Sequence, residues 1–160
     1  GRLIKCAAVY PEPFWRSEGL SGEALTDAGP VGLTFDNSPP SSTPGVLLGF
    51  VGGAAARRWG EVPGEERRAA VLADFARLFG PRAAAPDDYL ELDWGRGSGS
   101  GGGPPFAAPP GGWRNAGRRP SPPRGTVHWA GTETATRWAG FMDGAVSSGE
   151  RAAAAVVASL

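Results

Sequence analysis

The stretch from Gly95 to Gly125 limits the fold of this chain more than any other feature, because glycine and proline dominate it and no hydrophobic periodicity runs through it. Glycine and proline make up 26 and 16 of the 160 residues, and many of them fall here. Such a composition buries too few apolar side chains to build a core, and a structureless segment of this length is unusual inside a compact domain. The segment is either disordered or wraps something that the chain does not contain. We therefore expect structured parts over 1–93 and 126–160, joined by a Gly/Pro-rich loop over 94–125.

The first part combines apolar strands with one amphipathic helix. Apolar runs over Leu3–Tyr10 and Val46–Val51 predict two strands, the first of them covered on both faces because it is apolar nearly throughout. A helix is expected from Pro63 to Phe79, since Pro63 suits a first helical turn and Gly80-Pro81 stops it. Its apolar stripe should be core: Val71, Leu72, Phe75, Leu78 and Phe79. Shorter strands are expected near 25–27, 32–35 and 88–93.

The last part predicts a short strand, a polar turn and a second helix. The strand is expected over Thr126–Ala130 and the helix over Asp143–Ser159, with Asp143 as the N-cap. Small residues follow one face of this helix and would let it approach a sheet closely: Ala145, Val146, Gly149, Ala153, Val156 and Val157. Strands and helices together place the chain in the α/β (α+β) class.

Charge and composition exclude several classes of function. The 16 basic and 16 acidic residues balance, so no electrostatic signature for nucleic acid or for an anionic membrane surface exists. No apolar run reaches the roughly 20 residues of a transmembrane helix. One cysteine and one histidine exclude an internal disulfide and a structural zinc site, which needs about four such ligands.

The stretch from Trp129 to Ala152 carries the chemistry that the residues themselves suggest. Gly131 follows the expected strand and would let the backbone pass close to a ligand. The start of the next helix offers unpaired N–H groups and the positive end of a dipole. Glu133 could accept hydrogen bonds from sugar-like hydroxyl groups. The pattern predicts a polar cofactor site at a strand–helix junction.

The same stretch resembles the C-terminal flavin-binding signature of the flavin monoamine oxidase family. The matching residues are Ala130–Thr136, Trp138, Gly140, Met142, Gly144–Val146 and Gly149–Ala152. Upstream, Ile4-Lys5-Cys6 and Pro13-Phe14-Trp15 resemble the family's lysine-bearing strand, and Trp94 falls where its flavin-facing tryptophan does. The resemblance covers nearly all of the chain, and its final motif is highly specific.

The resemblance implies FAD, a two-domain fold and oxidation of an amine by oxygen to an aldehyde, ammonia or amine, and hydrogen peroxide. The chain would be its C-terminal portion, a mixed substrate-domain sheet plus helix followed by the strand–helix return to the FAD-binding domain. Lys5 would hold a water against flavin N5, Trp94 would pack near the ring, and Phe141 would form a wall of the substrate cage. The turn and helix start would contact the cofactor through Gly131, Thr132, Glu133, Met142, Asp143, Gly144, Ala145 and Val146.

Two positions depart from the family's pattern. In an ungapped alignment from Trp94, the cysteine that tethers the flavin falls on Gly103, so the FAD is expected to be bound without a covalent bond. The tyrosine of the second cage wall falls on Pro104, and Phe141 replaces a tyrosine in the other wall. The expected substrate cage, Pro104 and Phe141, is therefore one-sided and less polar. These departures favour the alternative of a degenerate homologue that binds FAD or a protein partner without turnover.

Each single residue also has a plainer interpretation. Lys5 could be a surface lysine at a strand edge, and Glu133 a turn or helix-cap carboxylate. The aromatic residues Trp94, Trp138 and Phe141 could be core side chains. His128 is expected to be packed and hydrogen-bonded, and Cys6 to be a small buried hydrophobe.

One part of a flavoenzyme is missing from the sequence. No Gly-x-Gly-x-x-Gly fingerprint between a strand and a helix occurs, so nothing here would bind the ADP half of FAD. We therefore expect a fragment that lacks an N-terminal dinucleotide-binding portion and that is inactive and poorly stable alone. The expected partners are a small-molecule amine, oxygen and a second copy of the protein in a homodimer.

Overall fold

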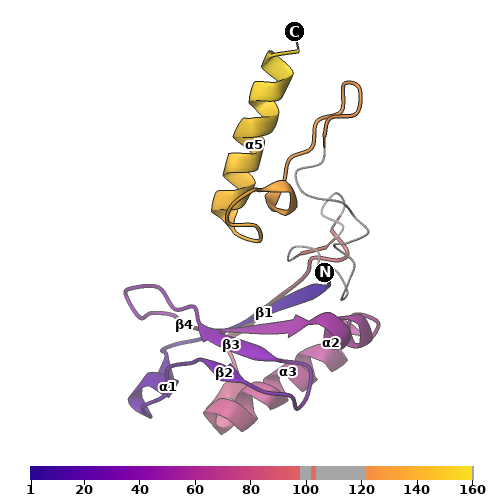
Figure 1. Ribbon diagram of the computed structural model, residues 1–160. Coiled ribbons are helices and arrows are strands. Elements are labelled where there is room, and N and C mark those ends of the chain that lie inside the picture. The colour runs from indigo at the N-terminus through magenta and orange to yellow at the C-terminus, as the bar shows by residue number, and fades with distance from the viewer. Residues whose placement is uncertain (98–101, 104–121, 160) are drawn as a thin grey trace. The chain divides into compact units, whose positions relative to one another are not determined.

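The computed structural model describes residues 1–97, 102–103 and 122–159. The chain divides into two compact units, Gly1–Gly103 and Pro104–Leu160, which are described separately (Figure 1). Most of the predicted Gly/Pro-rich loop, including Pro104, lies outside the described residues. Helices accompany an antiparallel sheet, which confirms the predicted fold class.

The first unit is built on a five-stranded sheet in the order β2-β3-β4-β1-β5, in which every pairing is antiparallel. The two predicted apolar strands are central neighbours, and the shorter predicted strands flank them. In chain order the strands are β1 (Leu3–Tyr10), β2 (Ala24–Leu25), β3 (Leu33–Asp36), β4 (Gly45–Gly52) and β5 (Asp88–Asp93).

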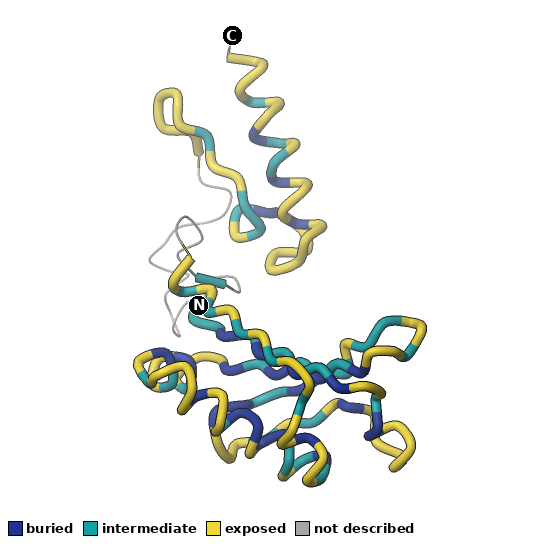
Figure 2. Tube along the Cα trace, turned by 180° about the vertical axis from the view of Figure 1, so that it is seen from behind, coloured by how far each residue is buried: buried dark blue, intermediate teal, exposed yellow. Residues whose placement is uncertain are grey.

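One face of the sheet is covered by helices. The predicted long helix is α3 (Gly64–Phe79), with Pro63 at the N-cap and Gly80 ending it at a φ of 89°. Phe75 packs directly on β4 at Gly49, where an added Cβ would lie 2.9 Å from the phenyl ring. The buried core between the helices and the sheet includes Trp15, Phe75, Phe79, Ile4 and Leu47 (Figure 2).

The opposite face of the sheet stays partly open within this unit. Along β1, buried residues alternate with partly buried ones, so the prediction that this strand is covered on both faces is wrong for the first unit. On β5, Leu90 and Leu92 are 56% and 52% exposed. On β1, the odd-numbered side chains, Lys5 among them, belong to this open face because side chains alternate across a strand.

Short elements join the strands. Phe14 and Trp15 begin α1 (Phe14–Ser17) and are buried, which explains the aromatic pair after the prolines that end β1. The helix α2 (Gly53–Trp59) was not predicted, because an Ala-Ala-Ala-Arg-Arg run has no apolar stripe. A 3₁₀ turn, η1 (Pro81–Ala84), follows α3. No helix in the described residues is long and apolar enough to cross a membrane.

The second unit contains a 3₁₀ turn, η2 (Thr132–Thr134), and the helix α5 (Met142–Val157) (Figure 1). The predicted strand over 126–130 is wrong: the described residues form only an isolated bridge between Arg124 and Val127, around Gly125 at a φ of 59°. A strand needs a neighbour for its backbone groups, and no strand of this unit is among its described residues.

The predicted start and packing face of α5 also need correction. Phe141 is the N-cap and makes no side-chain capping bond, so Asp143 is a first-turn residue and not the cap. The buried stripe is Gly144, Ser148 and Ala152, whereas the predicted face carries Val146 and Val157 at 62% and 71% exposure. Contacts with the preceding turn decide which small residues are buried, and periodicity does not reveal those contacts.

Candidate functional site

Lys5 lies on the open face of the sheet, between two aromatic rings of the first unit. Phe50 on β4 is its direct cross-strand partner, and Leu92 on β5 is its partner on the other side. The ammonium Nζ is 5.5 Å from the centroid of the Phe50 ring and 5.9 Å from that of Trp94. Aromatic faces attract a cation at these distances, so the two rings hold the only lysine of the sequence in place.

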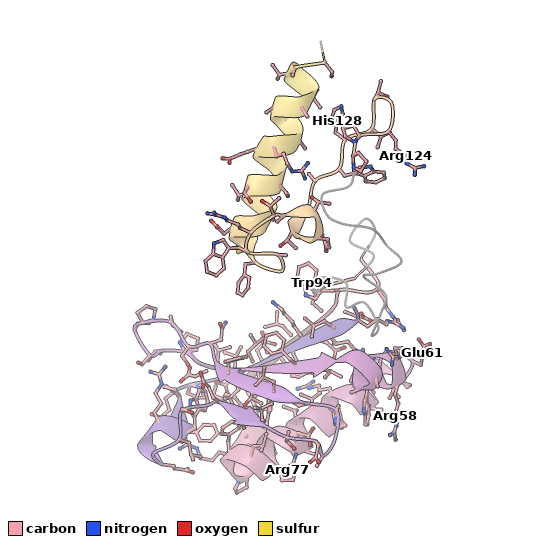
Figure 3. All side chains as sticks on the ribbon, viewed as in Figure 1. Arg58, Glu61, Arg77, Trp94, Arg124 and His128 are labelled. Carbon is pink, nitrogen blue, oxygen red and sulfur yellow. The ribbon has the colours of Figure 1, made fainter. Side chains whose placement is uncertain are left out.

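The positions of both rings follow from the sheet. Trp94 comes directly after β5, and its backbone N–H donates to the carbonyl of Leu3 at 3.1 Å (Figure 3). Phe50 packs edge-on against Phe35 with centroids 5.6 Å apart. Sequence analysis predicted Trp94 and missed Phe50. The antiparallel pairing of β1 with β4 could have found it, because this register sets Phe50 opposite Lys5.

A shallow hollow of about 230 Å³ adjoins the lysine on this face. Its lining is mostly apolar and comes from three neighbouring strands: Lys5, Ala7, Leu48, Leu90, Glu91 and Leu92. A larger groove of about 530 Å³ is lined by α3, from Glu65 to Ala73, and by Ala84 of η1, and it contains none of the predicted site residues. We take the smaller hollow as the candidate site, because an isolated cation in an apolar surface is the rarer arrangement.

In the second unit, hydrogen bonds between side chains and backbone organise the predicted turn. The Gly131 N–H donates to the Ser148 hydroxyl at 2.9 Å, and the Thr134 hydroxyl donates to the Gly131 carbonyl at 2.9 Å. Arg151 donates to Thr134 Oγ1 at 3.0 Å and to the Trp129 carbonyl at 3.2 Å. These bonds fasten the turn to α5 and hold Gly131 at a φ of 126°, which favours glycine.

Thr132 and Glu133 have different surroundings within that turn. The Thr132 hydroxyl accepts a bond from the Gly140 N–H at 2.6 Å and donates to the Phe141 carbonyl at 2.9 Å. Glu133 is exposed, and its carboxylate accepts no hydrogen bond from the described residues. The carboxylate is therefore available to a ligand, whereas both bonds of the threonine hydroxyl are internal.

The start of α5 presents apolar side chains to its surroundings. Phe141 and Met142 are 63% and 87% exposed, and Phe141 packs edge-on against Trp138 with centroids 6.0 Å apart. Gly144 is buried, and an added Cβ there would lie 2.2 Å from the Trp138 carbonyl oxygen. Of the predicted cofactor contacts in this turn of helix, Asp143, Ala145 and Val146 are exposed, and Gly144 fits the helix against the preceding loop.

The structure brings the predicted residues together in two sets. Lys5 and Trp94 form one set in the first unit, while residues 131–133 and 141–146 form the other in the second. Gly103 lies beside the first set: its N–H donates to the Gly1 carbonyl at 3.1 Å, and an added Cβ would be 3.7 Å from the Trp94 Cβ. Pro104 is outside the described residues. The roles given to these residues stay predictions.

The structure supports some of the plainer interpretations of single residues and contradicts others. Cys6 is fully buried, which confirms a small buried residue, and burial raises the pKa of its thiol to about 12. The core interpretation is wrong for Trp138 and Phe141, because both are more than 60% exposed. The expected hydrogen bonding of His128 is wrong for one nitrogen, since its buried Nδ1 has no partner among the described residues (Figure 3).

Sequence analysis did not predict the ion pair between Arg67 and Glu91 on the core side of β5. Arg67 is 8% exposed and donates through Nε to Glu91 at 2.8 Å, and through Nη1 to the Trp59 carbonyl at 2.7 Å. The hydrogen bond with Glu91 raises the pKa of Arg67. The other carboxylate oxygen accepts from the Tyr89 hydroxyl at 3.1 Å. Because all its strong partners are internal, this cluster fixes β5 to α3 and is not a binding site.

Comparison with known proteins places these features in one family. The family model described as flavin containing amine oxidoreductase matches residues 1–157. The chain is 51% identical over its full length to the Mycobacterium tuberculosis protein named "Putative flavin-containing monoamine oxidase AofH", of which it covers 35%. It is 43% identical over 98% of its length to an L-amino acid dehydrogenase of Synechocystis, of which it covers 33%.

Solved structures agree with this assignment. A putrescine oxidase with putrescine bound superposes with a TM-score of 0.87 at 36% identity, over 99% of this chain and 35% of that one. The cyclohexylamine oxidase of Brevibacterium oxydans superposes with a TM-score of 0.85 at 40% identity, over 98% and 35%. The chain therefore spans about a third of the length of the proteins that it matches.

Proposed function

The chain belongs to the flavin-containing amine oxidoreductase family, and from this premise we propose that it supplies the lysine-bearing sheet and the C-terminal flavin-binding turn of an FAD-dependent amine oxidase. The reaction converts an amine, oxygen and water into an aldehyde, ammonia or a smaller amine, and hydrogen peroxide. The activity is proposed for the complete polypeptide that carries this chain, because the chain covers only 35% of its relative AofH. Its relatives' names motivate testing monoamines, diamines and amino acids as substrates.

The observation that carries the proposal is the environment of Lys5. A cation that serves only solubility has no reason to stand in the middle of an apolar sheet face, 5.5 and 5.9 Å from two ring centroids. Held there, its ammonium can donate a hydrogen bond to a water and keep that water at one place. The leucines around it would exclude bulk solvent once the face is covered.

The residues present fit a flavin at its ring and ribityl end. Glu133 carries a carboxylate that accepts no hydrogen bond from the described residues and can accept bonds from ribityl hydroxyl groups, and Gly131 has no side chain to crowd a ligand beside it. The first turn of α5, from Met142, adds exposed apolar side chains and a helix N-terminus. When bound, FAD accepts the two electrons of amine oxidation and passes them to oxygen. Trp94 and Phe141 would border the amine and the flavin ring.

The cofactor is proposed to be bound without a covalent bond. Gly103 has no side chain to form a thioether, although it lies next to Trp94. Cys6, the only thiol, is buried on the core side of β1 with a raised pKa, so it cannot reach or attack a flavin. Denaturing the purified protein with acid should release all the yellow colour into the supernatant, and colour retained in the pellet would contradict this proposal.

The decisive experiment uses the complete polypeptide purified with its flavin. Anaerobic addition of benzylamine, putrescine, cyclohexylamine or an L-amino acid should bleach the flavin absorbance, and oxygen should then restore it with release of hydrogen peroxide. A protein whose flavin none of these compounds reduces would instead support the non-catalytic homologue. A protein that takes up no FAD would reject the oxidase and leave only a homologue that binds a protein partner.

A further inference from the structure

Thr132 links two features of the second unit that the proposed function treats separately. The residue belongs to the turn that carries Glu133, yet its hydroxyl bonds to the segment that carries Phe141. The Gly140 N–H donates to Thr132 Oγ1 at 2.6 Å, and Oγ1 donates to the Phe141 carbonyl at 2.9 Å. One side-chain oxygen thus joins the two ends of the loop from 132 to 141.

Backbone bonds hold the main chain of Phe141, since its N–H donates to the Trp138 carbonyl at 3.0 Å and its carbonyl accepts from the Ala145 N–H at 3.2 Å, but its ring has little support among the described residues. Its ring is 63% exposed and touches Trp138, which is itself 64% exposed. The backbone leading to Phe141 has unusual angles, with a φ of 54° at Trp138 and 94° at Gly140. Glycine adopts such an angle freely, but a left-handed tryptophan persists only where surrounding bonds enforce it. The two bonds of Thr132 are on either side of the peptide that leads into Phe141.

The hydroxyl of Thr132 is poorly available to a cofactor while these bonds exist. A hydroxyl group has one proton to donate and two lone pairs. The proton goes to the Phe141 carbonyl, and the Gly140 N–H occupies one lone pair. A direct hydrogen bond from this side chain to a flavin oxygen would therefore break the link to Phe141. Glu133, by contrast, has no such internal partner among the described residues.

We propose that Thr132 is a positioning residue, whose hydroxyl places the Phe141 ring relative to the turn that carries Glu133 and so sets how tightly the amine is held. The inference rests on the proposed function, in which Phe141 borders the amine. It differs from the expectation that the Thr132 side chain contacts the cofactor. The effect should appear in amine binding and not in flavin content.

The test compares three single variants in the complete flavoprotein. Thr132→Val keeps the shape of the side chain and removes both hydrogen bonds, while Thr132→Ser keeps the hydroxyl. Thr126→Val makes the same substitution at an exposed threonine outside the flavin-binding signature, whose side chain has no bond to the described residues. Stopped-flow flavin reduction under anaerobic conditions separates the amine dissociation constant from the reduction rate, and absorbance gives the flavin content.

Thr132→Val should raise the amine dissociation constant about five- to tenfold, the usual effect of losing one or two hydrogen bonds. The flavin content of Thr132→Val should equal that of the wild type. Thr132→Ser should bind the amine as the wild type does, and Thr126→Val should change neither quantity. The effect should also depend on the ring: in a Phe141→Leu background, adding Thr132→Val should leave the dissociation constant unchanged.

Several results would overturn the inference. An unchanged dissociation constant in Thr132→Val would do so, as would an effect of the same size in the Phe141→Leu background. Loss of flavin with normal amine binding in the remaining holoenzyme would make Thr132 a cofactor ligand instead. If Thr132→Val fails to fold, the comparison of Thr132→Ser with Thr132→Ala provides the same test. A wild-type flavin that no amine reduces would reject the proposed function itself, which is a separate outcome.

Discussion

The two units are held together in different ways. In the first, large side chains such as Trp15 and Phe75 are fully buried between the sheet and its helices. In the described part of the second, Ala135 and Ala152 are the only buried hydrophobic residues, and hydrogen bonds from Ser148 and other side chains organise the turn. Burial therefore stabilises the unit that carries Lys5, and polar bonding organises the unit that carries Glu133.

This difference bears on how each unit can support a site. A packed sheet holds Lys5 through strand register, which every pair in the ladder enforces. The flavin-binding turn depends on a few individual bonds, and its apolar side chains, such as Met142, remain exposed. We infer that the turn reaches its final rigidity only with the cofactor or further polypeptide around it, whereas the sheet is formed beforehand.

The largest expected effect is on stability, and it is tested by replacing one phenylalanine by alanine in each unit. Phe75→Ala should lower the free energy of unfolding of the first unit by about 3–5 kcal/mol, because the ring is fully buried. Phe141→Ala should change the stability of the second unit by no more than about 0.5 kcal/mol, since its ring is exposed. Hydrogen exchange of the β1 and α5 amides measures both, and equal losses would contradict the comparison.

The next effect concerns the rate of the proposed reaction. Lys5→Met should slow flavin reduction or reoxidation by about a hundredfold, the scale of losing a positioned proton-transfer or water-holding group. Stopped-flow absorbance of the flavin separates the two half-reactions. Arg57→Met, which removes an exposed cation of α2 in the same unit, is the matched control and should leave both rates unchanged. Unchanged rates in Lys5→Met would remove this lysine from the mechanism.

A smaller effect tests the polar bonding of the second unit. Ser148→Ala should lower its stability by about 1–3 kcal/mol, because the Gly131 N–H then loses its partner in a buried place. Ser147→Ala, on the exposed side of the same turn of α5, should change it by no more than about 0.5 kcal/mol. Hydrogen exchange in α5 would report the difference. Similar exchange rates in the two variants would show that Ser148 does not organise the turn.

The smallest effect is a loss of stability of the first unit at low pH. Burial opposes ionisation of Asp36, but bonds from Arg16, Ser38 and Trp15 outweigh it and lower the pKa of this carboxyl. Because the folded pKa is below the ordinary value of about 3.9, the contribution is present above that pH and is lost as the pH falls further. Since Arg16 is partly exposed, we expect a loss of about 1 kcal/mol.

Unfolding in urea at pH 7 and at pH 3 checks this prediction. The wild type should lose more stability between the two values than Asp36→Asn does, because the amide does not titrate. Equal losses in the two proteins would show that other groups carry the acid dependence of the first unit.

Local patterns in the sequence predicted much of the first unit. The apolar runs of β1 and β4 and the stripe that includes Val71 and Phe75 need no distant partner to be recognised, since periodicity and stop signals lie within each segment. The turn motif around Glu133 was found in the same way, through residue types at short spacing. The fold class and the family therefore follow from the sequence alone, and the site segments stay predictions.

Tertiary structure decided what depends on contacts between distant residues. Phe50 is part of the lysine site only because the pairing of β1 with β4 sets it opposite Lys5. The strand expected over 126–130 is absent, because the described residues there have no neighbouring strand to pair with. The buried face of α5 is set by the contact of Gly144 with the Trp138 carbonyl and by the bond of Ser148 to Gly131. Register and side-chain hydrogen bonds join residues far apart in sequence, so no local pattern contains them.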